Sequence, residues 1–177
     1  GFLYPDTYYL PPDATATDLR DTLLRTFQER ADAPIRAAAE ARGFTLYEVV
    51  TLASIVQREA VHVDEAPLIA GVYLNRYAIG MNLDADPTVQ YAIGYRDGTW
   101  WPSITADDYR TAQSPYNTYL HGGLPPGPIA NPSLAAIRAV VYPAESGYYY
   151  FRADCQGNGY HVFATTFEEH VANGNCP

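Results

Sequence analysis

One carboxylate in this sequence occupies a position where its surroundings could make it an acid near neutral pH. If residues 52–59 are helical, the side chains that share one face are Leu52, Ile55, Val56 and Glu59. Burial beside core-facing aliphatic groups disfavours the charged carboxylate and raises its pKa, as a general acid requires. The structural alternative is a Glu59 whose head reaches solvent, Arg58 or Arg76, and periodicity alone favours that alternative.

Polar and aromatic side chains gather between residues 81 and 132, a stretch rich in Pro, Gly, Asn, Asp and Tyr. A stretch of this kind inside one domain more often forms a functional surface than a simple connection. Its aromatic faces, hydroxyls and amides suit the alternating CH faces and hydroxyl groups of a sugar. The side chains expected to contribute to such a site are Asp86, Thr88, Tyr91, Tyr116, Asn117, Thr118 and Tyr119.

Several other chemistries lack the residues they need. The four His residues show no HExxH spacing and the two Cys residues are not CxxC, so we expect no metal site. Ser54 lacks the G-x-S-x-G context of a serine hydrolase, and no glycine-rich phosphate loop is present. All eleven cationic residues are Arg, and without Lys no covalent pyridoxal phosphate can form. We therefore expect no cofactor.

Composition bounds the class of protein. The 177 residues are 47% apolar and 18% charged, which is typical of one folded domain. A net charge of −9 argues against nucleic acid, whose phosphates require clustered Lys and Arg. No apolar run approaches the roughly 20 residues that span a bilayer. Cys155 and Cys176 are compatible with a disulfide in an exported domain, and two unpaired thiols are the alternative.

Helical patterns dominate the first half of the chain. The predicted helices begin at Thr17, near Ile35, at the Thr45–Glu48 capping box and at Asp64. Helical spacing of Leu19, Leu23 and Phe27 supports the first of these. The second ends at Gly43, the third near Ala60 and the fourth at Gly80.

The second half has a different pattern. Residues 81–132 show little periodicity beyond a short turn capped by Thr105, and Asn131-Pro132 should begin a helix through about Tyr142. Residues 148–153 and 160–165 are predicted to form a β-hairpin around the Gln-Gly-Asn-Gly turn at 156–159. A helical first half, a long Pro/Gly/Tyr-rich loop region and a C-terminal hairpin indicate an α+β fold.

Eight motifs occur in a fixed order along the chain. They are Gly-Phe-Leu-Tyr-Pro-Asp-Thr-Tyr at 1–8, Ala-Ser-Ile-Val-Gln-Arg-Glu at 53–59, Asn75-Arg76, Asp86-Pro-Thr-Val, Ser-Pro-Tyr-Asn-Thr-Tyr at 114–119, Gly-Leu-Pro-Pro-Gly-Pro-Ile-Ala-Asn-Pro at 123–132, Tyr-Phe-Arg-Ala-Asp at 150–154 and His161-Val-Phe. Over essentially its whole length the series resembles the endolytic murein transglycosylases, the MltG or YceG-like family.

The resemblance implies an activity and a set of site residues. Members of this family cleave nascent peptidoglycan strands between N-acetylmuramic acid and N-acetylglucosamine and leave a 1,6-anhydro end. The match assigns the catalytic acid/base to Glu59, and Gln57 replaces a second Glu that many relatives carry. It adds Asn75, Asn131 and His161 to the expected substrate-binding residues.

The resemblance also implies a cellular setting. We expect residues 1–177 to be a single catalytic domain at the outer face of the bacterial cytoplasmic membrane, with a membrane anchor and a LysM-like domain upstream. Glycan strands, and with them the cell-wall synthases, are the expected partners, and the membrane is reached only through that anchor. Two alternatives remain at this point. One is a muramidase-type hydrolase with Asp84 or Asp86 as its second carboxylate, and the other is a glycan-binding module without catalysis.

Overall fold

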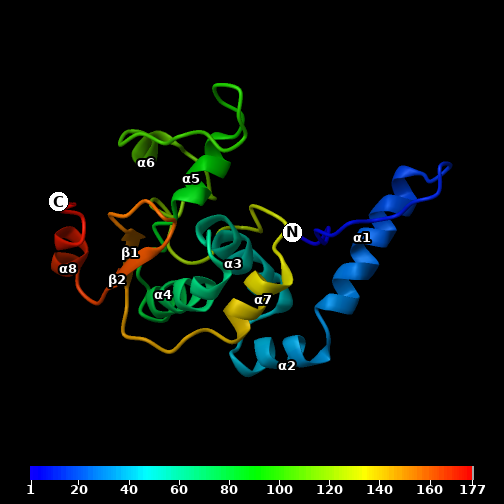
Figure 1. The fold of residues 1–177 in the computed structure, drawn as a ribbon, viewed down its shortest axis with the longest axis horizontal. Helices are drawn as coiled ribbons and strands as arrows, with labels where there is room; N and C mark the ends of the chain where they lie inside the picture. Colours follow the sequence, from blue (N-terminus) through cyan, green and yellow to red (C-terminus); the bar gives the residue numbers. More distant parts are fainter. Residues whose placement is uncertain (177) are drawn as a thin grey trace.

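Three helices form the centre of the computed structural model, which describes residues 1–176 (Figure 1). They are α3 (Leu46–Glu59), α4 (Ala66–Ala78) and α7 (Leu134–Val141), and each packs against the other two. Every residue of α3 from Val49 to Val56 is buried, because neighbouring elements cover the helix on all sides. α3 is therefore the central helix, and the acid at its last position is held by the core.

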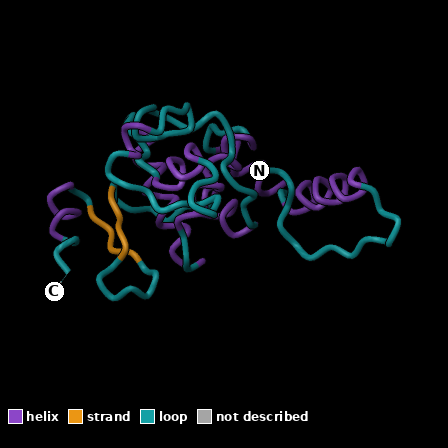
Figure 2. Tube along the Cα trace, turned by 90° about the horizontal axis from the view of Figure 1, so that it is seen from above, coloured by secondary structure: helices purple, strands orange, loops and turns teal. Residues whose placement is uncertain are grey.

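Two helices precede this centre. α1 (Ala16–Arg30) buries only Phe27 and projects to one side of the molecule (Figures 1 and 2). Its cap is Thr15, in a capping box with Asp18, so the predicted cap at Thr17 is wrong by two residues. α2 (Ala33–Ala41) begins slightly before the predicted start, because Asp32 caps it.

Of the predicted starts of the next two helices, one is confirmed and the other is wrong. The Thr45–Glu48 capping box opens α3, as predicted. Asp64 does not cap α4, because it lies inside a short 3₁₀ turn, η1 (Val63–Glu65). α4 begins only at Ala66, with Pro67 in its first turn, where the fixed φ of proline suits a helix start.

The stretch predicted to be irregular contains two helices. α5 (Asp86–Ile93) starts with an Asp-Pro pair, and α6 (Asp108–Thr111) is a single turn. α5 was missed because it lies in a stretch rich in Pro and Gly with little periodicity, whereas its Pro87 occupies the first turn of a helix. The cap of α7 is Ser133, whose Oγ accepts from the Ala136 amide, and not Asn131.

The chain ends in a hairpin and a short helix. β1 (Tyr150–Ala153) pairs antiparallel with β2 (His161–Ala164), with Phe151 opposite Phe163. Both strands are shorter than predicted, and α8 (Phe167–Ala172), which the sequence analysis did not predict, follows them. Helices surrounding a core and one two-stranded antiparallel hairpin confirm the α+β fold class.

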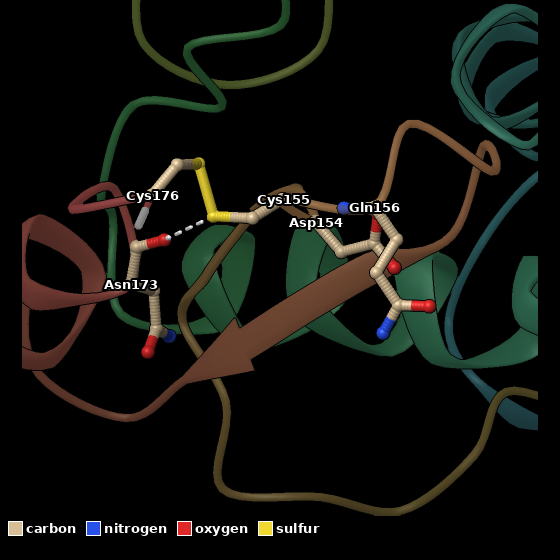
Figure 3. Close-up of a disulfide and its surroundings, with 5 residues drawn as sticks. All are labelled: Asp154, Cys155, Gln156, Asn173 and Cys176. Atoms are coloured by element: carbon tan, nitrogen blue, oxygen red, sulfur yellow. Dashed lines mark hydrogen bonds between the residues drawn. A yellow bond between two sulfur atoms is a disulfide. The ribbon is translucent and has the colours of Figure 1, made fainter.

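A disulfide ties α8 to the hairpin. Cys155, just after β1, is bonded to Cys176 beyond α8, and the carbonyl oxygen of Asn173 lies 4.0 Å from the Cys155 sulfur (Figure 3). The bond links two segments 21 residues apart, and α8 packs on both strands. Among residues 1–176, no helix has the length and apolar character needed to cross a membrane.

Candidate active site

A cavity of about 590 Å³ lies where the end of α3 meets α4, the start of α5 and the hairpin. The polar side chains that line it include Glu59, Tyr73, Asp84, Asp86, Tyr119 and His161. Two aromatic residues from the hairpin, Tyr150 and Phe151, also line the cavity. The cavity therefore combines carboxyl groups, phenols and aromatic faces.

Glu59 is the last residue of α3, and its side chain is partly buried at the cavity. The Tyr73 hydroxyl donates to Glu59 Oε1 over 2.7 Å. Burial raises the pKa of Glu59 from 4.5 to about 7, the Tyr73 hydrogen bond opposes that rise, and the nearby Asp86 charge adds to it. Arg58 lowers the pKa only as the smallest contribution. A carboxyl group with this pKa can hold a proton near neutral pH and release it during a reaction.

The arginines that could have neutralised Glu59 are engaged elsewhere. The Arg58 guanidinium stacks over the Trp101 ring at 4.0 Å from its centroid. Arg76 is almost fully buried and pairs with Asp84 over 3.3 Å. In the part of the chain that the structure describes, Glu59 therefore forms no ion pair with Arg58 or Arg76, the two arginines that the sequence offered as partners.

Tyr73 has a fixed role as a hydrogen-bond donor. Its side chain is 1% exposed, and burial together with the Glu59 charge raises the pKa of its phenol well above the ordinary value. The phenol therefore keeps its proton throughout the physiological range and directs it at Glu59. The Phe151 ring meets Tyr73 edge-on at 5.7 Å and holds it in place.

Asp86 and two tyrosines form a second polar group in the lining of the cavity. The Tyr119 hydroxyl donates to Asp86 Oδ1 over 2.6 Å, and the Tyr109 hydroxyl to Oδ2 over 3.4 Å. Burial and the Asp86 charge raise the pKa of both tyrosines. Asp86 is exposed and lies at the first residue of α5. Because the Asp86 carboxylate accepts a hydrogen bond from each of these two phenols, it positions their aromatic rings at the cavity.

Arg76 fastens the surrounding segments to α4. Its guanidinium donates to the carbonyl of Leu83 over 2.7 Å and to that of Tyr149, so it links the 82–84 segment with the strand region. Asp84 has φ of +49°, a left-handed conformation that few non-glycine residues adopt. Burial raises the pKa of Asp84, and the Arg76 charge opposes that rise. Neither Tyr73 nor Arg76 was predicted as a site residue, although both lie three positions apart on one helix.

Three predicted substrate-binding residues lie beneath the cavity rather than in its lining. Thr88, Asn117 and Thr118 are each 0–1% exposed. The hydroxyls of Thr88 and Thr118 are 2.9 Å apart, and Thr118 Oγ1 accepts from the Ala85 amide. The Asn117 amide donates to the carbonyls of Tyr109 and Ala112. These side chains hold the segments that carry Asp86, Tyr109 and Tyr119.

Four further predicted residues lie outside the cavity lining. The Asn75 amide donates to the carbonyls of Ser146 and Tyr148, both over 2.9 Å, and so secures the approach to β1. Tyr91 and Tyr116 pack on one another with ring centroids 4.8 Å apart. Asn131 accepts a hydrogen bond from the Leu3 amide. The structure thus brings only Asp86, Tyr119 and His161 of the predicted substrate-binding set together with Glu59.

Within residues 1–176, no group of three or more His, Cys, Asp or Glu side chains is arranged to hold a metal ion.

Residues 1–175 match the profile of the YceG-like family. The chain belongs to the YceG-like family. A Bacillus subtilis (strain 168) protein named endolytic murein transglycosylase is 33% identical over 172 residues, which are 96% of this chain and 45% of that protein. A protein of the same name from Streptococcus pneumoniae (serotype 2, strain D39) is 33% identical over 178 residues, 98% of this chain and 31% of its own length.

A solved structure shares the fold. The crystal structure of a YceG-like protein from Listeria monocytogenes superposes with a TM-score of 0.84 at 35% identity, covering 97% of this chain and 53% of that chain. These matches confirm the family resemblance seen in the ordered motifs. The chain spans less than half the length of the two named relatives, so this YceG-like domain corresponds to one part of them.

Proposed function

We propose that this YceG-like domain is a lytic transglycosylase that cleaves peptidoglycan glycan strands, with Glu59 as its single catalytic acid and base. The observation that carries the proposal is a carboxyl group with pKa about 7, hydrogen-bonded to a buried phenol, in the wall of a sugar-sized cavity. The relatives named endolytic murein transglycosylases support the choice of substrate and reaction.

The first step requires the protonated form of Glu59. Because Tyr73 donates to Oε1, that oxygen is occupied and Oε2 is the oxygen available to carry the transferable proton. Protonation of the glycosidic oxygen by this group lets the bond to C1 of N-acetylmuramic acid break. Developing positive charge at C1 is then stabilised by the newly formed Glu59 carboxylate.

The second step closes a ring within the substrate. The C6 hydroxyl of the same sugar attacks C1 and forms the 1,6-anhydro bond, while the Glu59 carboxylate takes the hydroxyl proton. When the attacking group and its target belong to one bound molecule, positioning alone can lower the barrier by roughly 7–11 kcal/mol. A second catalytic carboxylate, which ordinary glycosidases need to activate water or attack C1, is therefore not required.

The other cavity groups would orient the sugar. Asp86 and Tyr119 present a carboxylate and a phenol for hydroxyl groups, and the Tyr109 and Tyr119 rings, 4.5 Å apart, offer apolar faces. Thr88, Asn117 and Thr118 act indirectly, by holding these groups in place. Some of the predicted residues thus contact the substrate, and others support them.

The cellular location is part of the same proposal. A disulfide between Cys155 and Cys176 suits an oxidising compartment outside the cytoplasm, where peptidoglycan strands are assembled. We accordingly propose that the domain acts at the outer face of the cytoplasmic membrane.

Product analysis separates this function from its alternatives. The domain is incubated with uncross-linked glycan strands, and the masses of the released fragments are measured by mass spectrometry. A transglycosylase gives 1,6-anhydro ends, whereas a hydrolase using Asp84 or Asp86 gives reducing ends heavier by one water. Reducing ends would refute the ring-closure mechanism, and binding without cleavage would support a glycan-binding module.

A further inference from the structure

A buried carboxylate that the proposed mechanism does not use lies next to the cavity. Glu65, at the junction of η1 and α4, is only 9% exposed. Its Oε1 accepts from the backbone N–H of His161 over 3.0 Å, and its Oε2 lies 3.0 Å from His161 Nδ1. Both oxygens of Glu65 therefore bind one residue, the first of β2.

This pairing fixes how the His161 ring presents its two nitrogens. A carboxylate only accepts hydrogen bonds, so Nδ1 carries a hydrogen, and whenever the ring is neutral its lone pair is on Nε2. The Phe151 ring meets the imidazole edge-on at 5.3 Å and limits its rotation. His161 lines the cavity, and within residues 1–176 Nε2 has no hydrogen-bond partner and is not among the buried unpartnered atoms.

If Glu65 served only to attach the hairpin to α4, it would not need to bind the His161 ring as well as the His161 backbone. Burying a carboxylate costs free energy unless it is well paired, and in the described residues the side chain that pairs with Glu65 is His161. One oxygen on the backbone N–H would secure β2 to α4. The second oxygen adds control of the imidazole, as outer carboxylates do for functional histidines in other proteins.

We propose that Glu65 is a positioning residue that holds His161 with Nε2 facing the cavity, where Nε2 accepts a hydrogen bond from a hydroxyl group of the bound glycan. This inference rests on the proposed function, since it assumes a sugar in the cavity. It adds a polar contact to the site from β2, a different part of the chain from the α5 residue Asp86.

Glu65→Gln tests the proposal with a change of one atom. A Gln oxygen can still accept from the His161 backbone N–H, but its amide then donates to Nδ1, so the ring hydrogen moves to Nε2 and the acceptor is lost. Nitrogen-15 NMR of the imidazole reports which nitrogen is protonated. The matched control is Glu145→Gln, because Glu145 is exposed and lies outside the cavity lining.

Binding is measured with a hexamer of N-acetylglucosamine as the probe. Loss of one hydrogen bond should weaken binding about fivefold to tenfold in Glu65→Gln and leave Glu145→Gln unchanged. In the wild type, the probe should shift the Nε2 resonance. The proposal is overturned if Glu65→Gln keeps the wild-type tautomer, or if its affinity equals that of the control.

A second variant covers the case in which Glu65→Gln does not fold, and the choice of readouts separates this test from that of the proposed function. His161→Phe preserves a planar ring and removes both nitrogens, so if Glu65→Gln fails to fold, wild-type affinity in His161→Phe would overturn the proposal and a fivefold to tenfold loss would support it. The readouts are binding and protonation, whereas the proposed function is judged by anhydro products from glycan strands. Failure of one is therefore distinguishable from failure of the other.

Discussion

Replacing Glu59 by Gln should stabilise the folded protein, and increasingly so as the pH rises. Glu59→Gln removes the ionisable group but keeps an oxygen that can accept the Tyr73 hydrogen bond now 2.7 Å long. The substitution therefore isolates the cost of placing a charge at the end of α3. A residue retained for catalysis at the expense of stability should show this behaviour.

The magnitude follows from the two pKa values. The proton on Glu59 binds more tightly in the folded state, where the pKa is about 7, than in the unfolded state, where it is near 4.5. The stabilisation that this proton provides is complete below about pH 4.5 and is lost as the pH rises through 7. At 1.36 kcal/mol for each pKa unit, the total change is about 3 kcal/mol.

Urea unfolding of both proteins between pH 4.5 and pH 8 measures this directly. Other titrating groups are shared by the two proteins and cancel in the difference between their free energies of unfolding. That difference should change by about 3 kcal/mol across the range, in favour of Glu59→Gln at high pH. A difference that stays constant with pH would refute the raised pKa of Glu59.

Three further predictions concern activity and stability. The kcat/KM of the wild type should fall about tenfold for each pH unit above about 7, because the acid form of Glu59 is lost; a pH–rate profile that is flat to pH 9 would contradict this. Tyr73→Phe removes a hydrogen bond that lowers the pKa of Glu59, so the falling limb of the same profile should move to higher pH, and movement to lower pH would be the opposite of our expectation. Replacing Cys155 and Cys176 together by Ser opens a loop closed across 21 residues and should cost about 3 kcal/mol in thermal or urea unfolding, whereas equal stability of the two forms would show that the bond adds nothing.

Sequence patterns predicted those features that local chemistry determines. The Thr45–Glu48 capping box located the start of α3, and helical spacing placed Glu59 on the core-facing stripe. The turn at 156–159 and its flanking alternation located the hairpin. In each case a few neighbouring residues carry the physical cause, so one sequence was sufficient.

The remaining parts of the site depend on contacts between distant segments. Tyr73 and Glu65 were not identified, because a tyrosine or a glutamate on a helix gains meaning only from what lies opposite it. Thr88 and Thr118 share hydroxyl contacts across 30 residues, which no local pattern reveals. α5 was missed because an Asp-Pro pair suits both a turn and the first turn of a helix.

The central claim is that Glu59 donates the proton to the glycosidic oxygen and thereby allows the glycan strand to be cleaved. Its most direct test is the amount of 1,6-anhydro product released from uncross-linked glycan strands by wild type, Glu59→Gln and the exposed control Glu145→Gln at pH 6. Wild type and Glu145→Gln should give equal amounts of anhydro ends, and Glu59→Gln, folded and able to bind the strands, should give none above background. Substantial anhydro product from Glu59→Gln would contradict the claim.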